Sequence, residues 1–88
     1  MTPRNRAQKP VLYALSTCIW CRRTKELLNN AGIDYKVYDV DILTGDERAA
    51  VLSEMRKYNP DGSFPTLVCG DKVVSGYDED EIKKALGI

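Results

Sequence analysis

The 88-residue sequence contains no histidine, one phenylalanine, one tryptophan and only three cysteines. The missing histidine excludes mixed Cys/His zinc sites, and three cysteines are too few for a four-cysteine site. No apolar run approaches the roughly 18 residues of a membrane span, and no apolar segment of a secretory signal follows the start. Few cysteines and no such signal favour a cytoplasmic protein without a membrane partner, in which a close cysteine pair is more often catalytic than structural.

Acidic residues are scarce in only one part of the sequence, its first 25 residues. The sequence has 13 basic and 13 acidic residues, yet residues 1–25 carry six basic side chains and no acidic one. This segment is either solvated surface or a positive rim that attracts an anionic thiol or an acidic partner. No basic run alternates with aromatic residues, so we expect no nucleic-acid binding. The length and an apolar share of 43% indicate one globular domain.

The most informative motif is the pair Cys18 and Cys21, which stands where an apolar run ends and a helical pattern begins. Residues 11–15 have the pattern of a short buried strand. The helical pattern runs from Cys18 to Ala31 and stops at Gly32. The pair is therefore predicted at a strand-to-helix corner, with Cys18 in the first turn.

Such a corner favours thiolate chemistry at Cys18. The free N–H groups and the positive dipole end of the helix stabilise a thiolate, and Arg22, Arg23 and Lys25 add positive charge nearby. Cysteines in such positions have pKa values of about 3.5–7.5 instead of about 8.5. One helical turn also brings Cys21 within disulfide-bonding reach. The pair can therefore attack a disulfide and then resolve the mixed disulfide internally.

Two other interpretations of the pair remain open at this point. The two cysteines are half of a zinc site, but the only further thiol is Cys69. They could also form an inert structural disulfide, although a loop closed by two intervening residues stabilises a fold little.

The remaining patterns predict the element order β-α-β-α-β-β-α. Thr44 and Glu47 have capping-box spacing at the start of the second helix, and Gly70-Asp71 has the composition of a hairpin turn. Residues 1–10 are predicted to be a flexible N-terminal arm, and residues 11–88 a single domain. The predicted strands are residues 11–15, 33–40, 64–69 and 72–75, and the predicted helices are residues 18–31, 44–58 and 78–86.

Three stretches together give a specific resemblance. They are Cys18-Ile19-Trp20-Cys21, Ser63-Phe64-Pro65-Thr66 and Ser75-Gly76-Tyr77-Asp78. In order and spacing, residues 11–86 resemble the glutaredoxin family. The resemblance implies an α/β, thioredoxin-like fold with a four-stranded mixed sheet flanked by three helices.

The resemblance also implies a substrate site. Pro65 corresponds to the family's cis-proline facing the cysteine pair, which would expose the backbone of Phe64 for pairing with a peptide or glutathione. The alternative is an ordinary trans proline. Gly76, Tyr77 and Asp78 correspond to positions that hold the γ-glutamyl end of glutathione, although Asp78 could equally only cap the last helix.

Side chains around the pair complete the predicted site. Trp20 is either a core residue or an exposed platform beside Cys18, and we include it with Arg22 among the substrate-binding candidates. Cys69 is expected to be a small apolar residue of a buried strand. Four tyrosines fall on apolar-patterned positions and are expected to be core or half-buried: Tyr13, Tyr35, Tyr38 and Tyr58.

The electron donor is left open by departures from the family pattern. Ile19 and Trp20 replace the usual Pro and Tyr, and Leu15 replaces a Lys that meets a glutathione carboxylate in many members. Ser75-Gly76 followed by Tyr77 is similar to the NrdH-redoxins, which take electrons from thioredoxin reductase. Val74 and Asp78 differ from their usual Trp and Arg. Glutathione and thioredoxin reductase are therefore both candidate reductants.

The sequence thus predicts a monomeric dithiol thiol–disulfide oxidoreductase, with Cys18 as nucleophile and Cys21 as resolving thiol. Its partners would be disulfide-containing proteins or glutathione mixed disulfides. We expect no bound cofactor and no metal site, with glutathione as a possible co-substrate. The alternative is a module that binds or carries a [2Fe–2S] cluster, in which the first cysteine of two subunits and two glutathiones ligate the cluster.

Overall fold

The computed structural model describes residues 9–88, so the predicted N-terminal arm lies outside the described residues except for its last two. Within residues 9–88, no helix is long and apolar enough to cross a membrane. The described elements follow the predicted order: β1 (Val11–Ala14), α2 (Ile19–Asn30), β2 (Lys36–Asp39), α3 (Gly45–Tyr58), β3 (Thr66–Cys69), β4 (Lys72–Ser75) and α4 (Glu79–Leu86).

The four strands form one mixed sheet in the order β2-β1-β3-β4. β1 and β2 are parallel, with Val11 opposite Lys36. β3 runs antiparallel to both β1 and β4. A two-residue turn joins β3 to β4, and Gly70 adopts there the positive φ of 65° that glycine tolerates best. The predicted mixed sheet and the predicted hairpin are therefore confirmed.

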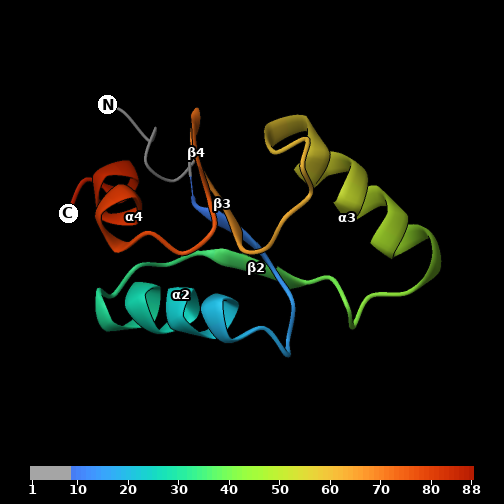
Figure 1. The fold of residues 1–88 in the computed structure, drawn as a ribbon, viewed down its shortest axis with the longest axis horizontal. Coiled ribbons are helices and arrows are strands. Elements are labelled where there is room, and N and C mark those ends of the chain that lie inside the picture. Colours follow the sequence, from blue (N-terminus) through green and yellow to red (C-terminus); the bar gives the residue numbers. More distant parts are fainter. Residues whose placement is uncertain (1–8) are drawn as a thin grey trace.

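Helices cover both faces of the sheet (Figure 1). Because successive strand residues point to opposite faces, Leu12 and Ala14 of β1 face α2 and α4, whereas Tyr13 faces α3. The larger core, on the side of α2 and α4, includes the fully buried Leu28 and Ile82. This core holds the start of α2 against the end of β1, which is the corner that carries the cysteine pair.

Several element ends differ from prediction. β2 begins at Lys36 instead of residue 33, because the Ile33 N–H donates to the Leu28 carbonyl (3.0 Å) and so belongs to the end of α2. β3 begins after Pro65, which has no N–H to donate to a neighbouring strand. α2 and α4 each begin one residue later than predicted, since Cys18 and Asp78 are the residues that cap them.

The second helix, α3, contradicts two predictions. Thr44 stands at its N-cap but makes no side-chain capping hydrogen bond, so the predicted capping box is wrong. Tyr58 is 42% exposed rather than core or half-buried. Tyr13 is buried, and Tyr35 and Tyr38 are half-buried, as predicted. The only residue that α3 buries fully is Met55, so this helix is held to the sheet more loosely than α2.

Candidate functional site

Cys18 lies at the corner between β1 and α2, where its half-buried side chain caps the helix. The Cys21 N–H donates to Cys18 Sγ at 3.3 Å. Burial opposes ionisation, but hydrogen bonds from the thiol and N–H of Cys21 and from the N–H of Trp20 outweigh it and lower the pKa of Cys18. The sequence attributed this lowering partly to Arg22, Arg23 or Lys25; hydrogen bonds account for it instead.

Cys21 is fully buried one turn further along α2. Its Sγ accepts a hydrogen bond from the Leu15 N–H at 3.4 Å. Burial is the main cause that raises the pKa of Cys21 to about 12, and the hydrogen bond and charge of Cys18 add to it. Both thiols are free. The two sulfurs therefore differ in ionisation: Cys18 is the more acidic and accessible thiol, and Cys21 is the protonated, buried one.

Lys25 acts on the buried thiol. Its positive charge is one of the influences that lower the pKa of Cys21. Its Nζ lies 2.8 Å from Oδ1 of Asp39 at the end of β2, and both side chains are about three-quarters buried, with exposures of 26% and 24%. The sequence did not predict this ion pair, because the approach of the two residues depends on how α2 crosses the sheet.

Asp41 fixes the loop before Cys18. Its carboxylate accepts hydrogen bonds from both the N–H (2.8 Å) and the hydroxyl of Ser16. These bonds lower the pKa of Asp41, although the group is exposed. The sequence did not predict this contact. The role of Asp41 as a loop anchor depends on the contact between the segment after β2 and the β1–α2 loop, which no local pattern encodes.

An aromatic surface flanks Cys18. Trp20 is 52% exposed, so its interpretation as a core residue is wrong. Its ring stacks on Tyr77, with centroids 5.6 Å apart, and the Arg23 guanidinium carbon lies 5.7 Å from the ring centre. Ile19 is also exposed, at 55%. The first turn of α2 thus presents apolar surface beside Cys18, continuous with Tyr77 before α4.

The proline loop, residues 63–66, lies at the edge of the core against which Cys18 also packs. The Phe64–Pro65 peptide bond is cis, as the resemblance implies. The Gly76 N–H donates to the Pro65 carbonyl at 2.8 Å, and Gly76 has a φ of 82° that favours glycine there. Phe64, Tyr77 and Cys18 all pack against the core that contains Cys21. The structure therefore brings together most of the residues that the sequence singled out.

Three other predicted residues lie differently. Asp78 caps α4 by accepting a hydrogen bond from the Glu81 N–H (3.2 Å), which confirms its capping interpretation and leaves its substrate role a prediction. Arg22 is exposed and forms no ion pair within residues 9–88. Cys69 is half-buried, and burial raises its pKa.

A buried polar network holds the proline loop, and the sequence missed it. Asn59, only 5% exposed, donates from Nδ2 to the hydroxyl oxygens of Ser63 (3.1 Å) and Thr66 (2.9 Å). The Thr66 hydroxyl in turn donates to the Ser63 carbonyl at 2.7 Å. The sequence predicted only that the helix before Asn59 ends at residue 58. The burial of Asn59 ties the end of α3 to the start of β3.

We expect Asn59→Ala to lower the free energy of unfolding by about 1–3 kcal/mol, because it removes the buried amide that donates to the buried Thr66 hydroxyl. Urea denaturation followed by circular dichroism measures this loss. Asn30→Ala, at the exposed end of α2, is the matched control and should change stability by no more than about 0.5 kcal/mol. Equal effects of the two substitutions would contradict a structural role for the network.

Metal-binding side chains do not gather in the described part of the chain: within residues 9–88, no three His, Cys, Asp or Glu residues are placed to hold a metal ion. The cysteine pair therefore has no further ligand from its own chain there. A cluster at Cys18 would need ligands other than a third His, Cys, Asp or Glu of residues 9–88.

Comparisons with known proteins agree with this site. A family model described as Glutaredoxin matches residues 11–74. The crystal structure of a glutaredoxin from Archaeoglobus fulgidus superposes with a TM-score of 0.86 at 34% identity, covering 98% of this chain and 95% of that one. A glutaredoxin from Methanosarcina mazei gives a TM-score of 0.85 at 43% identity, covering 91% and 79%. The glutaredoxin-like protein NrdH of Escherichia coli is 26% identical over 73 residues, 83% of each chain.

Proposed function

Because the chain belongs to the glutaredoxin family, we propose that it is a dithiol thiol–disulfide oxidoreductase that works through Cys18 and Cys21. The observation that carries this proposal is the contrast between the two thiols. Hydrogen bonds at the start of α2 lower the pKa of Cys18, whereas burial raises that of Cys21 to about 12. A nucleophile and a reserve thiol are the two groups that the exchange reaction needs.

The reaction has two exchange steps. The Cys18 thiolate attacks one sulfur of a substrate disulfide, forms a mixed disulfide and expels the other sulfur as a thiolate, which takes up a proton. Cys21 then loses its proton and attacks Cys18 Sγ, which releases the second substrate thiolate and leaves a Cys18–Cys21 disulfide. Two electrons thus pass to the substrate, and an external donor must return two electrons to the pair.

A protein disulfide is the substrate that the surroundings of Cys18 favour. Ile19 and Trp20 expose apolar side chains beside the nucleophile, and Tyr77 extends this surface. Exposed aromatic residues are typical of protein-binding surfaces. The backbone of Phe64 before the cis-proline would pair with the substrate, and Gly76, Tyr77 and Asp78 would line the far side. A reducing compartment such as the cytoplasm would keep the pair reduced.

Two electron donors fit this site. Membership of the glutaredoxin family and the basic residues near Cys18 support glutathione. Leu15, the Ser75-Gly76-Tyr77 stretch and the similarity to the NrdH protein support thioredoxin reductase. Reduction of a disulfide-containing protein, measured separately with glutathione plus glutathione reductase and with thioredoxin reductase, tests the proposal. Turnover with one donor supports the proposed activity and identifies the donor; no turnover with both would contradict it.

We expect Lys25→Gln to slow the second exchange step and leave the first unchanged. The ammonium group lowers the pKa of the buried Cys21, so its loss makes that thiol harder to ionise. The decay of the mixed disulfide should slow by up to about tenfold, the effect of one pKa unit. Acid quenching and mass spectrometry resolve the two steps. Lys57→Gln on the exposed end of α3 is the control, and equal decay in both variants would exclude this role of Lys25.

Cluster binding is the alternative function. It rests on Cys18 alone among the described residues, and the other ligands would have to come from a second subunit and glutathione. No exchange step described above uses a cluster. Anaerobic reconstitution with iron and sulfide in the presence of glutathione tests the alternative, because a bound cluster absorbs visible light. A colourless product would exclude it.

A further inference from the structure

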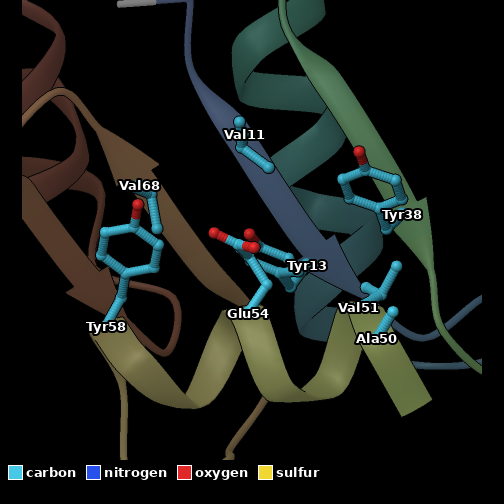
Figure 2. Close-up of a pocket in the computed structure, with 8 residues that line it drawn as sticks. All are labelled: Val11, Tyr13, Tyr38, Ala50, Val51, Glu54, Tyr58 and Val68. Atoms are coloured by element: carbon cyan, nitrogen blue, oxygen red, sulfur yellow. The ribbon is translucent and has the colours of Figure 1, made fainter. Parts of the chain in front are cut away.

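A cavity of about 330 Å³ lies on the face of the sheet opposite the cysteine pair, beneath α3. Tyr13 of β1, Tyr38 of β2 and Tyr58 of α3 contribute three phenol rings, and Glu54 of α3 contributes a carboxylate. Figure 2 shows Glu54 rising from α3 toward Tyr13, with the rings of Tyr58 and Tyr38 to either side. Neither exchange step uses any of these side chains.

The cavity is open to solvent rather than sealed in the core. Glu54 and Tyr58 are exposed, and so is Ala50 at the wall nearer the start of α3. This opening follows from the loose contact of α3 with the sheet, because Met55 is its one fully buried side chain. The volume lies at the lower end of the range for small-molecule sites, about 300–1,000 Å³. A small ligand can therefore enter without unfolding the helix.

The electrostatic character of the lining favours positive charge. Its residues include one carboxylate and three phenols but no basic side chain. The pKa of Tyr13 is raised to about 12, mainly by burial and further by the charges of Glu54, Tyr58 and Tyr38. The ionised forms of these groups therefore repel one another through space, so the lining disfavours a further negative charge. A cation would instead be attracted by Glu54 and by the negative faces of the rings.

The aromatic residues already interact with an ammonium group of the chain itself. Tyr13 and Tyr38 stack with ring centroids 5.7 Å apart. The Nζ of Lys36, which is not among the lining residues, lies 5.2 Å from the centre of the Tyr38 ring. This distance is within the roughly 6 Å at which a cation is attracted to an aromatic face. The tyrosine cluster is thus electronically suited to a cation.

We propose that this cavity binds a small organic ammonium ion. Glu54 is its counter-ion, the tyrosine rings surround the charged nitrogen, and Val51 and Val68 contact its carbon substituents. Rings around an ammonium group are a recurrent solution for binding such ligands. The site is independent of the proposed redox function, since it lies on the other face of the sheet and includes neither thiol.

Choline and its neutral carbon analogue 3,3-dimethylbutan-1-ol are matched probes, because they share shape and differ in charge. We expect choline to shift the amide resonances of Val51 and Tyr58 in the reduced 88-residue chain in a saturable manner. The neutral analogue should bind about tenfold more weakly. Equal responses to the two compounds, or no response to choline, would overturn the proposal.

Two variants separate the roles of charge and ring. Glu54→Gln and Tyr58→Leu should each weaken choline binding at least about fivefold, whereas Glu47→Gln, on the same helix but outside the cavity, should not. Both lining residues are exposed, so the substitutions leave the core intact, and an unchanged Trp20 resonance verifies this. If N-acetyl-lysine amide binds more tightly than choline, the proposal of a free small molecule as ligand is overturned. Such a result would point to a lysine of a partner protein.

Discussion

Cys18→Ser should abolish disulfide reduction, lowering turnover by about three orders of magnitude or more, as loss of a nucleophile does in other enzymes. The thiolate is the attacking species, and a serine hydroxyl at the same place does not ionise at neutral pH. The fold should survive, because serine is a favourable N-cap residue and can accept the hydrogen bond that Cys21 N–H donates at that position. Turnover is measured with a protein disulfide and whichever donor supports the native chain.

Cys69→Ser is the matched control for this experiment. It also removes one thiol, but from β3, where Cys69 is half-buried and burial raises its pKa. We expect the Cys69 variant to retain full activity. Full turnover by Cys18→Ser, or comparable losses in both variants, would remove the basis for assigning the nucleophile to the start of α2.

The sequence predicted this corner because its determinants are local. The apolar run of β1, the helical pattern from Cys18 and the spacing of the two cysteines all lie within one continuous segment. The element order along the chain and the hairpin at Gly70 followed in the same way from alternation and turn composition. Patterns of this kind depend on residues that are neighbours in the sequence, so they can be recognised without knowledge of the tertiary fold.

The missed features depend on contacts between distant segments. Asp41 reaches Ser16 across 25 positions, and Asp39 reaches Lys25 across 14. The exposure of Trp20 was also undecided, because an aromatic residue in a first helical turn can face either way until its neighbours are known. The loop before α4 determines which way the Trp20 ring faces, since Tyr77 of that loop stacks on it.

α3 shows a different limit of sequence patterns. The sequence placed Tyr58 in the core or half-buried, yet this residue is exposed and the helix buries fully only Met55. The Thr44–Glu47 spacing fitted a capping box that does not form. Such a motif requires the N-cap side chain to turn toward the helix, and spacing alone does not determine that rotamer. The loose packing leaves the cavity on this face of the sheet.

Cys21→Ser should separate the two exchange steps. Cys18 keeps the backbone hydrogen bonds that lower its pKa and still forms a mixed disulfide, but no second thiol stands one turn away to release the substrate. Turnover of a protein disulfide should fall on the order of 100-fold or more, because an intramolecular attack is replaced by one from solution. Under mild oxidation the mixed disulfide should accumulate, detectable by mass spectrometry as one substrate chain bound per protein.

The double variant Cys21→Ser with Cys69→Ser tests whether any other thiol can resolve the intermediate. Cys69 belongs to β3 and is absent from the core that holds Cys18 and Cys21, so its removal should not increase the trapped fraction further. Added glutathione should release the substrate from both variants at the same rate. If Cys21→Ser alone yields no trapped species while the double variant does, Cys69 is the resolving thiol, and the division of roles along α2 is wrong.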